Sequence, residues 1–146
     1  MTEHSVYLGL GTNLGDKEDN LRRAVEHIDK LIGKVLRQSA YFTSQPWGFV
    51  SGNAFVNAAV CCRTVLSPQE VLCRTQQIEQ MMGRKHKSVD GIYHDRIIDI
   101  DILLYDELQI DEPNLTIPHP LMHEREFVMV PLMEVLDNAR RLLPVY

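Results

Sequence analysis

Residues 96–104 have the sequence RIIDIDILL, in which isoleucine alternates with aspartate. A run of β-branched residues with a period of two predicts a β-strand. On such a strand the isoleucines point to one face, while Asp99 and Asp101 point together to the other. The stretch therefore predicts a core strand that carries two neighbouring carboxylates on a single face.

The pair formed by Asp99 and Asp101 has two interpretations. Two carboxylates side by side repel each other, and burying either one without compensation is costly. A hard cation such as Mg²⁺, which keeps several waters and also binds substrate phosphates, is the usual partner for such a pair. Alternatively, the two carboxylates are simply solvated on the wet face of a sheet. This stretch alone leaves both interpretations open.

Length and composition indicate an ordinary globular chain. It has 146 residues, 45% of them hydrophobic, which fits one domain over residues 1–146. It has no apolar run of membrane-spanning length and no signal-peptide pattern at its start, so we expect a cytoplasmic protein with no membrane partner. A net charge of −5 argues against nucleic acid as a partner. We expect Cys61, Cys62 and Cys73 to be buried, reduced thiols.

The first half of the chain predicts a strand, a glycine turn, a helix and a second strand. Residues 5–10 are the first strand, and residues 9–15 form a tight turn. The third glycine of this turn is one place too late for a dinucleotide-binding fingerprint, so we reject that interpretation. Asp16 is a suitable N-cap for the following amphipathic helix. Residues 35–43 predict the next strand.

The second half begins with a strand over residues 55–64. A capping-box pattern, SPQE at residues 67–70, then predicts the start of a helix that ends at Gly83. Within this helix, Gln76 and Glu79 lie three residues apart, away from the apolar stripe, so they can act together.

Two loops are candidates for ligand contacts. Residues 44–53 contain Trp47 between proline and glycine residues, and they form either a ligand lid or a loop folded back for packing. Residues 84–95 are polar and basic, and they lead directly into the acidic strand. A polyphosphate with bound Mg²⁺ would need basic side chains for its phosphates and acidic side chains for its metal close together.

The last part of the chain predicts a turn or hairpin over residues 106–115 and a helix over residues 127–136, although Pro131 weakens the start of that helix. His119 and His123 have a spacing that suggests zinc, but prolines flank His119 and no third ligand is evident. We therefore disfavour a zinc site.

The predicted order β-α-β-β-α-β is typical of an α+β, ferredoxin-like fold. Its antiparallel sheet carries two helices on one face, and here a C-terminal helical extension follows. The other face can stay open for a ligand, and Asp99 and Asp101 would point into that space.

Several motifs, in this order along the chain, give it a resemblance to the 6-hydroxymethyl-7,8-dihydropterin pyrophosphokinases of folate biosynthesis. The motifs are Gly11-Thr12-Asn13-Leu14, Pro46-Trp47-Gly48, Phe55-Val56-Asn57-Ala58, Gln76-Gln77-Ile78-Glu79 with Gly83-Arg84, Arg96-Ile97-Ile98-Asp99-Ile100-Asp101-Ile102, and Thr116-Ile117-Pro118-His119 followed by Arg125 and Phe127. The chain departs from the family pattern at His94 and Asp95, directly before the acidic strand.

The resemblance implies an enzyme that transfers pyrophosphate from ATP to the hydroxymethyl oxygen of the pterin and releases AMP. It implies two Mg²⁺ ions held by Asp99 and Asp101, with Arg84 and Arg96 holding phosphates and stabilising charge. Such an enzyme uses small-molecule substrates, and we expect a monomer.

The same resemblance implies two groups of binding residues. On the nucleotide side they are Gln76, Glu79, Arg84, Arg96, the backbone of Ile102, the Thr116 hydroxyl, His119 and Arg125. On the pterin side they are Gly11, Ser44, Trp47, Phe55, Asn57, Asp99 and Phe127, with Asn57 bonded to the pterin edge and the two phenylalanines stacked on its faces.

Two other classes of protein also fit parts of the pattern. A polymerase-like nucleotidyl transferase on the same core also uses close aspartates, but its substrate calls for a basic surface. A regulatory small-molecule-binding module would leave the basic residues beside Asp99 and Asp101 without a role.

Overall fold

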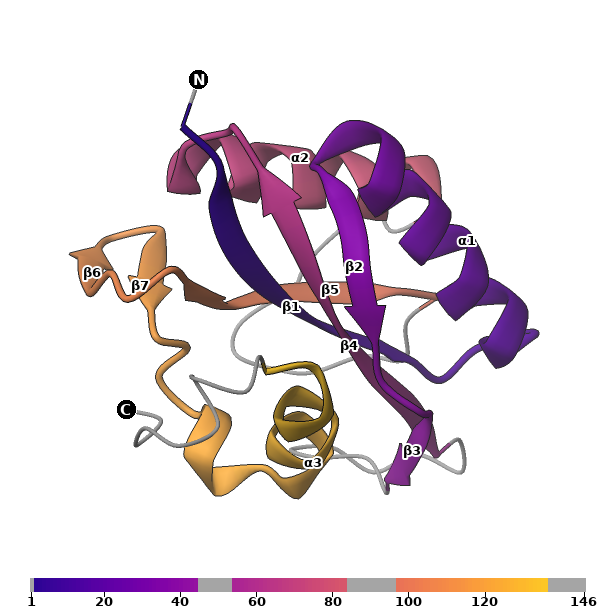
Figure 1. The fold of residues 1–146 in the computed structure, drawn as a ribbon. Coiled ribbons are helices and arrows are strands. Elements are labelled where there is room, and N and C mark those ends of the chain that lie inside the picture. Colours follow the sequence, from indigo (N-terminus) through magenta and orange to yellow (C-terminus); the bar gives the residue numbers. More distant parts are fainter. Residues whose placement is uncertain (1, 45–53, 84–96, 137–146) are drawn as a thin grey trace.

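The computed structural model describes residues 2–44, 54–83 and 97–136, which form an antiparallel sheet between helices (Figure 1). None of the described helices is long and apolar enough to cross a membrane. In chain order the elements are β1 (His4–Thr12), α1 (Lys17–Leu31), β2 (Lys34–Gln38), β3 (Phe42–Ser44), β4 (Phe55–Thr64), α2 (Pro68–Met81), β5 (Asp99–Tyr105), β6 (Ile110–Glu112), β7 (Leu115–Ile117), the 3₁₀ helix η1 (Met122–Glu124) and α3 (Glu126–Val135).

The main sheet has the strand order β2-β4-β1-β5, and β3 also pairs with β4. All of its pairings are antiparallel. Along the chain, α1 follows β1 and α2 follows β4, so this is the predicted α+β, ferredoxin-like arrangement. The predicted hairpin after β5 is also present, as β6 and β7, and the predicted C-terminal helix is α3.

The prediction of a single strand over residues 35–43 is wrong, because this stretch is divided between β2 and β3. Between these two strands, three residues, 39–41, face only two residues of β4. The backbone N–H of Ser39 donates to the Ala59 carbonyl at 2.9 Å, and the Ser39 hydroxyl accepts from the Ala59 N–H at 2.9 Å. The extra residue breaks the regular pairing, and the hydroxyl takes the place of a backbone acceptor.

The glycine turn predicted over residues 9–15 is also wrong in its extent. Gly9 and Gly11 belong to β1, which continues to Thr12. Of the three glycines in this stretch, only Gly15 has the left-handed backbone of a turn glycine, with φ of 69°. Asp16 then caps α1 as predicted, since its side chain accepts from the Asp19 N–H at 3.1 Å.

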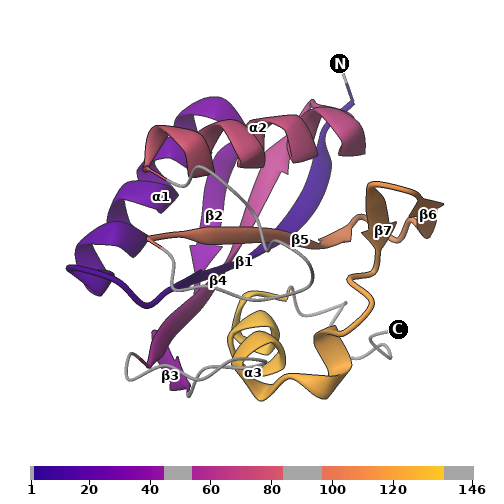
Figure 2. The same ribbon diagram turned by 180° about the vertical axis from the view of Figure 1, so that it is seen from behind.

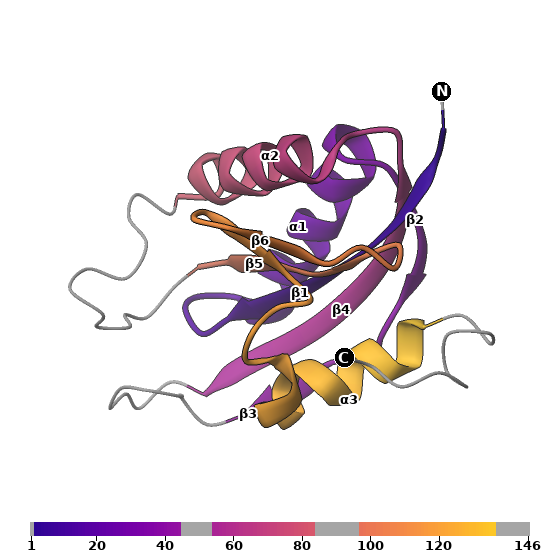
Figure 3. The same cartoon turned by 90° about the vertical axis from the view of Figure 1, so that its left-hand side faces the viewer.

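The first face of the sheet, defined as the face that α1 and α2 cover, is mainly apolar. Figure 3 shows both helices on this side and α3 on the other. The predicted capping box of α2 is present at Ser67 and Glu70. The buried residues of this face include the three predicted isoleucines of the acidic strand, and they are Val6, Leu8, Leu10, Leu21, Ala24, Ile28, Ile32, Ala58, Val60, Cys62, Val71, Ile78, Met82, Ile98, Ile100, Ile102, Tyr105, Leu115 and Ile117.

The second face of the sheet is only partly open, in contrast to the expectation that it stays open for a ligand. Helix α3 covers one part of it (Figure 3), and Met122 of η1 joins the same buried cluster. Pro131 lies within α3, which nevertheless begins at Glu126, and the N-cap residue Arg125 makes no side-chain cap bond. The buried residues of this second cluster are Tyr7, Ala59, Cys61, Leu103, Leu104, Met122, Leu132, Val135 and Leu136.

A bulge in β5 allows this second cluster to form. The pairing of β1 with β5 is irregular, because Tyr7 faces Leu104 and Leu8 faces Ile102, which leaves Leu103 as an extra residue. Leu103 and Leu104 therefore both join the cluster under α3, and the strict alternation predicted up to residue 104 ends at Ile102.

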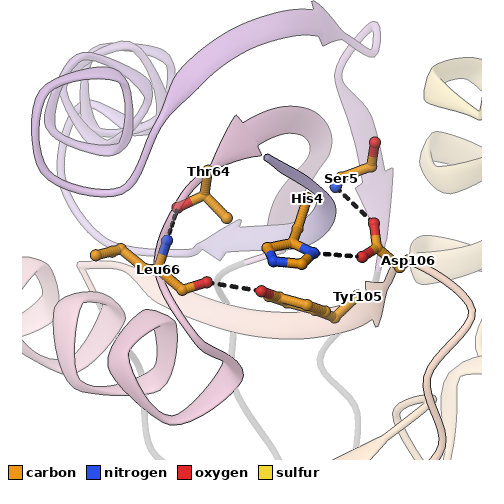
Figure 4. A network of polar contacts seen from close by, with 6 residues as sticks. All are labelled: His4, Ser5, Thr64, Leu66, Tyr105 and Asp106. Carbon is orange, nitrogen blue, oxygen red and sulfur yellow. Dashed lines mark hydrogen bonds and ion pairs between the residues drawn. The ribbon is translucent and has the colours of Figure 1, made fainter. Parts of the chain in front are cut away.

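The C-terminal end of β5, away from Asp99 and Asp101, is held by polar contacts (Figure 4). One Asp106 oxygen lies 2.7 Å from His4 Nδ1, and the other accepts from the Ser5 N–H at 2.8 Å. The Tyr105 hydroxyl donates to the Leu66 carbonyl at 2.7 Å. These bonds tie the end of β5 to the start of β1 and to the connection between β4 and α2.

The cysteine prediction is right for two residues and wrong for the third. Cys61 and Cys62 are buried and face opposite sides of the sheet, as adjacent strand residues do. Burial raises the pKa of the Cys62 thiol to about 12, so this group stays neutral. Cys73, in contrast, is exposed on α2.

Candidate active site

A row of directly paired residues, one from each of four strands, crosses the second face beyond the part that α3 covers. The pairing register places Asp99 of β5 opposite Gly11 of β1, Gly11 opposite Asn57 of β4, and Asn57 opposite Phe42 of β3. Directly paired residues of antiparallel strands lie side by side on the same face. The register thus brings the predicted residues Gly11, Asn57 and Asp99 together, although they are far apart in the sequence.

The next row contains Asp101, which lies opposite Gly9 of β1. In both rows the β1 position beside the aspartate is a glycine, so no β1 side chain stands next to either carboxylate. At Gly11 an added Cβ would lie 3.1 Å from Asn57 Oδ1 and 3.6 Å from Phe55 Cδ1. A side chain at residue 11 would therefore crowd two residues predicted to bind the pterin.

Asn57 is held in one orientation. It is buried, and its Nδ2 donates to the Phe42 carbonyl at 3.0 Å and to the Ser44 hydroxyl at 2.8 Å. Both amide hydrogens are thereby used, which turns Oδ1 toward Gly11 as an acceptor. Ser44 also pairs with Phe55 across β3 and β4, so the structure brings these three predicted pterin-side residues together.

The two carboxylates suit a magnesium ion that shares its coordination with a substrate. Asp99 and Asp101 are half-buried, and two residues of strand separate their Cα atoms by about 6.7 Å. Within the described residues, no group of three or more His, Cys, Asp or Glu side chains is placed to hold a metal ion by itself. Mg²⁺ is commonly bound by one or two carboxylates, with waters and phosphates completing the shell. The donor set therefore fits the group that the sequence predicted.

Glu79 and Gln76 occupy different environments, contrary to the prediction that they share a face away from the apolar stripe and act together. Gln76 is exposed on α2, whereas Glu79 is only 3% exposed. One Glu79 oxygen accepts from the backbone N–H of Ile100 at 2.8 Å, between the two aspartates.

His119 is fixed beside β5 by its backbone. Its N–H donates to the carbonyl of the bulge residue Leu103 at 3.1 Å. Its ring Nδ1 accepts from the Leu121 N–H at 3.3 Å, so in the neutral ring Nε2 carries the hydrogen. Thr116 is exposed on β7, which contacts β5, the strand of Ile102.

Arg125 and Phe127 lie at the start of α3 and interact with each other. The guanidinium carbon is 5.6 Å from the centre of the Phe127 ring, within range of a cation–π contact. The stacking of Phe127 and Phe55 on opposite faces of a pterin stays a prediction.

Three predicted residues, Trp47, Arg84 and Arg96, lie outside the described residues, as do the loops that follow Ser44 and Gly83.

One supporting residue was not predicted. Asn20 is buried in the first turn of α1, and its Nδ2 donates to the Thr12 hydroxyl at 3.1 Å and to the Leu14 carbonyl at 2.8 Å. These bonds fix the turn that follows Gly11. A polar residue beside the apolar stripe of the predicted helix was the available signal.

Comparisons with known proteins give a consistent result. Residues 7–137 match the model of the family described as 7,8-dihydro-6-hydroxymethylpterin-pyrophosphokinase (HPPK). The 2-amino-4-hydroxy-6-hydroxymethyldihydropteridine pyrophosphokinase of Porphyromonas gingivalis ATCC 33277 is 47% identical over 131 residues, which cover 89% of each chain. The protein of the same name from Bacillus subtilis strain 168 is 38% identical over 140 residues, covering 93% of this chain and 80% of that one.

Solved structures support the fold. The wild-type HPPK-DHPS of Plasmodium falciparum superposes with a TM-score of 0.72 over 91% of this chain, at 16% identity. The chain spans only 41% of that longer protein. The family match and the relatives establish that the chain belongs to the 7,8-dihydro-6-hydroxymethylpterin-pyrophosphokinase family and is a transferase of the pyrophosphokinase class.

Proposed function

We propose that this chain transfers pyrophosphate from ATP to the hydroxymethyl group of 6-hydroxymethyl-7,8-dihydropterin, releases AMP, and thereby serves folate biosynthesis. In this proposal Asp99 and Asp101 hold two Mg²⁺ ions. The observation that carries it is the row on the second face, in which a carboxylate, a glycine and a fixed amide lie side by side in a member of this family.

The pterin side of the proposed site is built around Asn57. Because its two amide hydrogens are used by Phe42 and Ser44, Oδ1 is the atom that can accept from an N–H of a flat heterocycle. The ring of Phe55 lies next to Gly11, and in our proposal it stacks on the pterin. Trp47, Phe127 and Asp99 complete this part of the proposed site.

The metal-binding carboxylates lie next to the acceptor, where the transfer takes place. Bound Mg²⁺ neutralises phosphate charge and helps to align the attacking and leaving oxygens. Asp99, which faces Gly11 in the pterin row, is the carboxylate nearer to the acceptor, and Asp101 lies one row further along the strand. The protein contributes position and charge, which is most of what phosphoryl-type transfer requires.

The nucleotide side lies, in this proposal, along β5 and the segment after β7. The Ile102 backbone and the Thr116 hydroxyl bind the adenine, and His119 donates from Nε2 to a phosphate. The bond from Leu121 N–H to Nδ1 supports this donor role, because it favours the tautomer with the hydrogen on Nε2. Gln76, Arg84, Arg96 and Arg125 complete the proposed nucleotide contacts. We further propose that the protein acts in the cytoplasm as a monomer.

The two alternatives suggested by the sequence are not retained. The family match spans residues 7–137 and includes every described residue of the proposed site. Neither a polymerase-like transferase nor a regulatory module is consistent with that match.

A product assay tests the proposed function. The purified protein is incubated with ATP, Mg²⁺ and 6-hydroxymethyl-7,8-dihydropterin, and the nucleotides are separated by chromatography. We expect AMP and pterin diphosphate in equal amounts, and no AMP when the pterin or Mg²⁺ is omitted. Formation of ADP, or AMP formation without pterin, would contradict the proposal.

A further inference from the structure

Glu79 is a buried carboxylate of α2 that lies against the edge of the acidic strand. Figure 2 shows α2 running beside β5, the strand at the end of the sheet order. We propose that Glu79 is a positioning residue, whose side chain fixes the backbone between Asp99 and Asp101 and thereby sets the geometry of the two carboxylates. This inference rests on the proposed metal-binding role of Asp99 and Asp101.

The argument begins with the position of the hydrogen bond. Among the described strands β5 pairs with β1 alone, so the N–H groups on its other side need different acceptors. Glu79 Oε2 accepts from the Ile100 N–H at 2.8 Å. This N–H belongs to the peptide group that joins Asp99 to Ile100. Fixing the plane of that peptide restricts the backbone at Asp99, and with it the direction in which the Asp99 side chain leaves the strand.

Burial strengthens this contact. Glu79 is only 3% exposed, and a hydrogen bond inside a protein is electrostatically stronger than one in water. Mg²⁺ requires nearly ideal octahedral geometry at about 2.0–2.1 Å, so small changes in ligand direction matter. A strand edge that is held by Glu79 is therefore better suited to a magnesium site than an edge bonded to water.

The other end of β5 is held independently. The Leu103 carbonyl accepts from the His119 N–H, and Asp106 is bonded to His4 and Ser5. Glu79 holds the backbone at the end that carries the aspartates. Its role in our proposal is exerted through β5, which replaces the direct nucleotide contact implied by the resemblance.

Two substitutions separate positioning from a direct contact. Glu79→Gln keeps an oxygen that can accept from Ile100 N–H but removes the charge. Glu79→Met keeps a similar length and volume but removes the oxygen acceptor. Glu70→Ala is the matched control, because it removes the other carboxylate of α2, at the capping box and away from the end of β5 that carries the aspartates.

The measurement is the binding of Mn²⁺, a substitute for Mg²⁺ at oxygen sites, in the presence of a non-hydrolysable ATP analogue, monitored by electron paramagnetic resonance. Nucleotide binding without metal and the thermal midpoint are measured on the same samples. We expect Glu79→Met to weaken Mn²⁺ binding by about 10- to 100-fold, the effect typical of residues that orient metal ligands. Glu79→Gln should bind Mn²⁺ nearly as the wild type does. Metal-free nucleotide binding should be unchanged in both variants, and Glu70→Ala should lower only the thermal midpoint.

Two results would overturn the inference. The first is a Glu79→Gln variant that loses Mn²⁺ affinity, because the charge and not the hydrogen bond would then be required. This result decides the question even if Glu79→Met does not fold. The second is a folded Glu79→Met variant with wild-type Mn²⁺ affinity. The proposed function fails separately, if the wild type with the ATP analogue binds no Mn²⁺ at all.

Discussion

The two faces of the sheet differ in how their residues are used. The first face is mainly apolar, and α1 and α2 cover it. The second face is divided, because α3 covers an apolar part and leaves a polar part with Asp99, Asp101 and Asn57. The two faces belong to the same strands, since alternate residues of β1, β4 and β5 point to opposite sides.

This difference indicates where stability and function lie in the molecule. Buried apolar side chains on the first face and under α3 supply the hydrophobic stabilisation. The polar part of the second face contributes little of it, and its neighbouring carboxylates repel each other. Substitutions in the apolar regions should therefore lower the stability of the fold. Substitutions in the polar part should instead lower turnover.

The largest expected effect is on the polar part. Asp99→Asn and Asp101→Asn should each lower turnover by roughly 10²- to 10³-fold, the cost of removing an important electrostatic group from an active site. The thermal midpoint should not fall, because each substitution also relieves carboxylate repulsion. Steady-state kinetics and thermal melts measure the two effects. Asp29→Asn, on exposed α1 surface, is the control. Near-normal turnover in both variants would mean that the pair is only solvated.

The next effect should appear in the apolar regions. Ile28→Ala in α1 and Leu132→Ala in α3 remove fully buried side chains that pack in the first and the second cluster. Each should lower the free energy of unfolding by about 2–5 kcal/mol, from lost burial and the remaining cavity. Urea denaturation measures this loss, and the KM for each substrate should be unchanged in the folded protein. If Leu132→Ala had little effect on stability, the division of the second face would be wrong.

A smaller effect is expected at the amide beside the carboxylates. Asn57→Ala should raise the KM for the pterin by about tenfold, as expected for the loss of one well-placed hydrogen bond. The KM for ATP should change little. Ser44→Ala is the matched variant, because the Phe42 carbonyl still holds the Asn57 amide, and its effect should be smaller. Equal effects on both substrates would argue against a pterin-specific role.

The smallest effect concerns Glu70, which lies on the first-face helix α2 and away from the site. Hydrogen bonds from Ser67 lower the pKa of Glu70 below its ordinary value of 4.5. A lowered pKa in the folded state stabilises the protein above the unfolded value, and this stabilisation is lost as the pH falls through the folded value. The stability difference between wild type and Glu70→Gln should therefore be present at neutral pH and decrease at pH values well below 4.5. Urea unfolding at several pH values measures it, and a constant difference would contradict the assignment.

Local sequence patterns predicted the parts of the fold that depend on local physics. The alternation of isoleucine and aspartate predicted which side of β5 is buried, and the SPQE pattern predicted the start of α2. The motifs also named Gly11, Asn57 and Asp99, which the pairing of three strands brings into one row.

The remaining features depend on contacts between distant parts of the chain. The bulge at Leu103 is stabilised by an apolar cluster with α3 and by a bond from His119, neither of which is visible in the strand itself. The break between β2 and β3 depends on the pairing of Ser39 with Ala59. Similarly, Glu79 has the sequence position of a polar surface residue, and only the packing of α2 against β5 buries it.

The central claim is that the polar part of the second face binds metal together with the nucleotide. Counting Mn²⁺ ions by electron paramagnetic resonance, with a non-hydrolysable ATP analogue and pterin present, tests it most directly. We predict two bound ions per wild-type chain and a loss of ions in Asp101→Asn. Two ions bound equally well by Asp101→Asn, or none bound by the wild type, would contradict the claim.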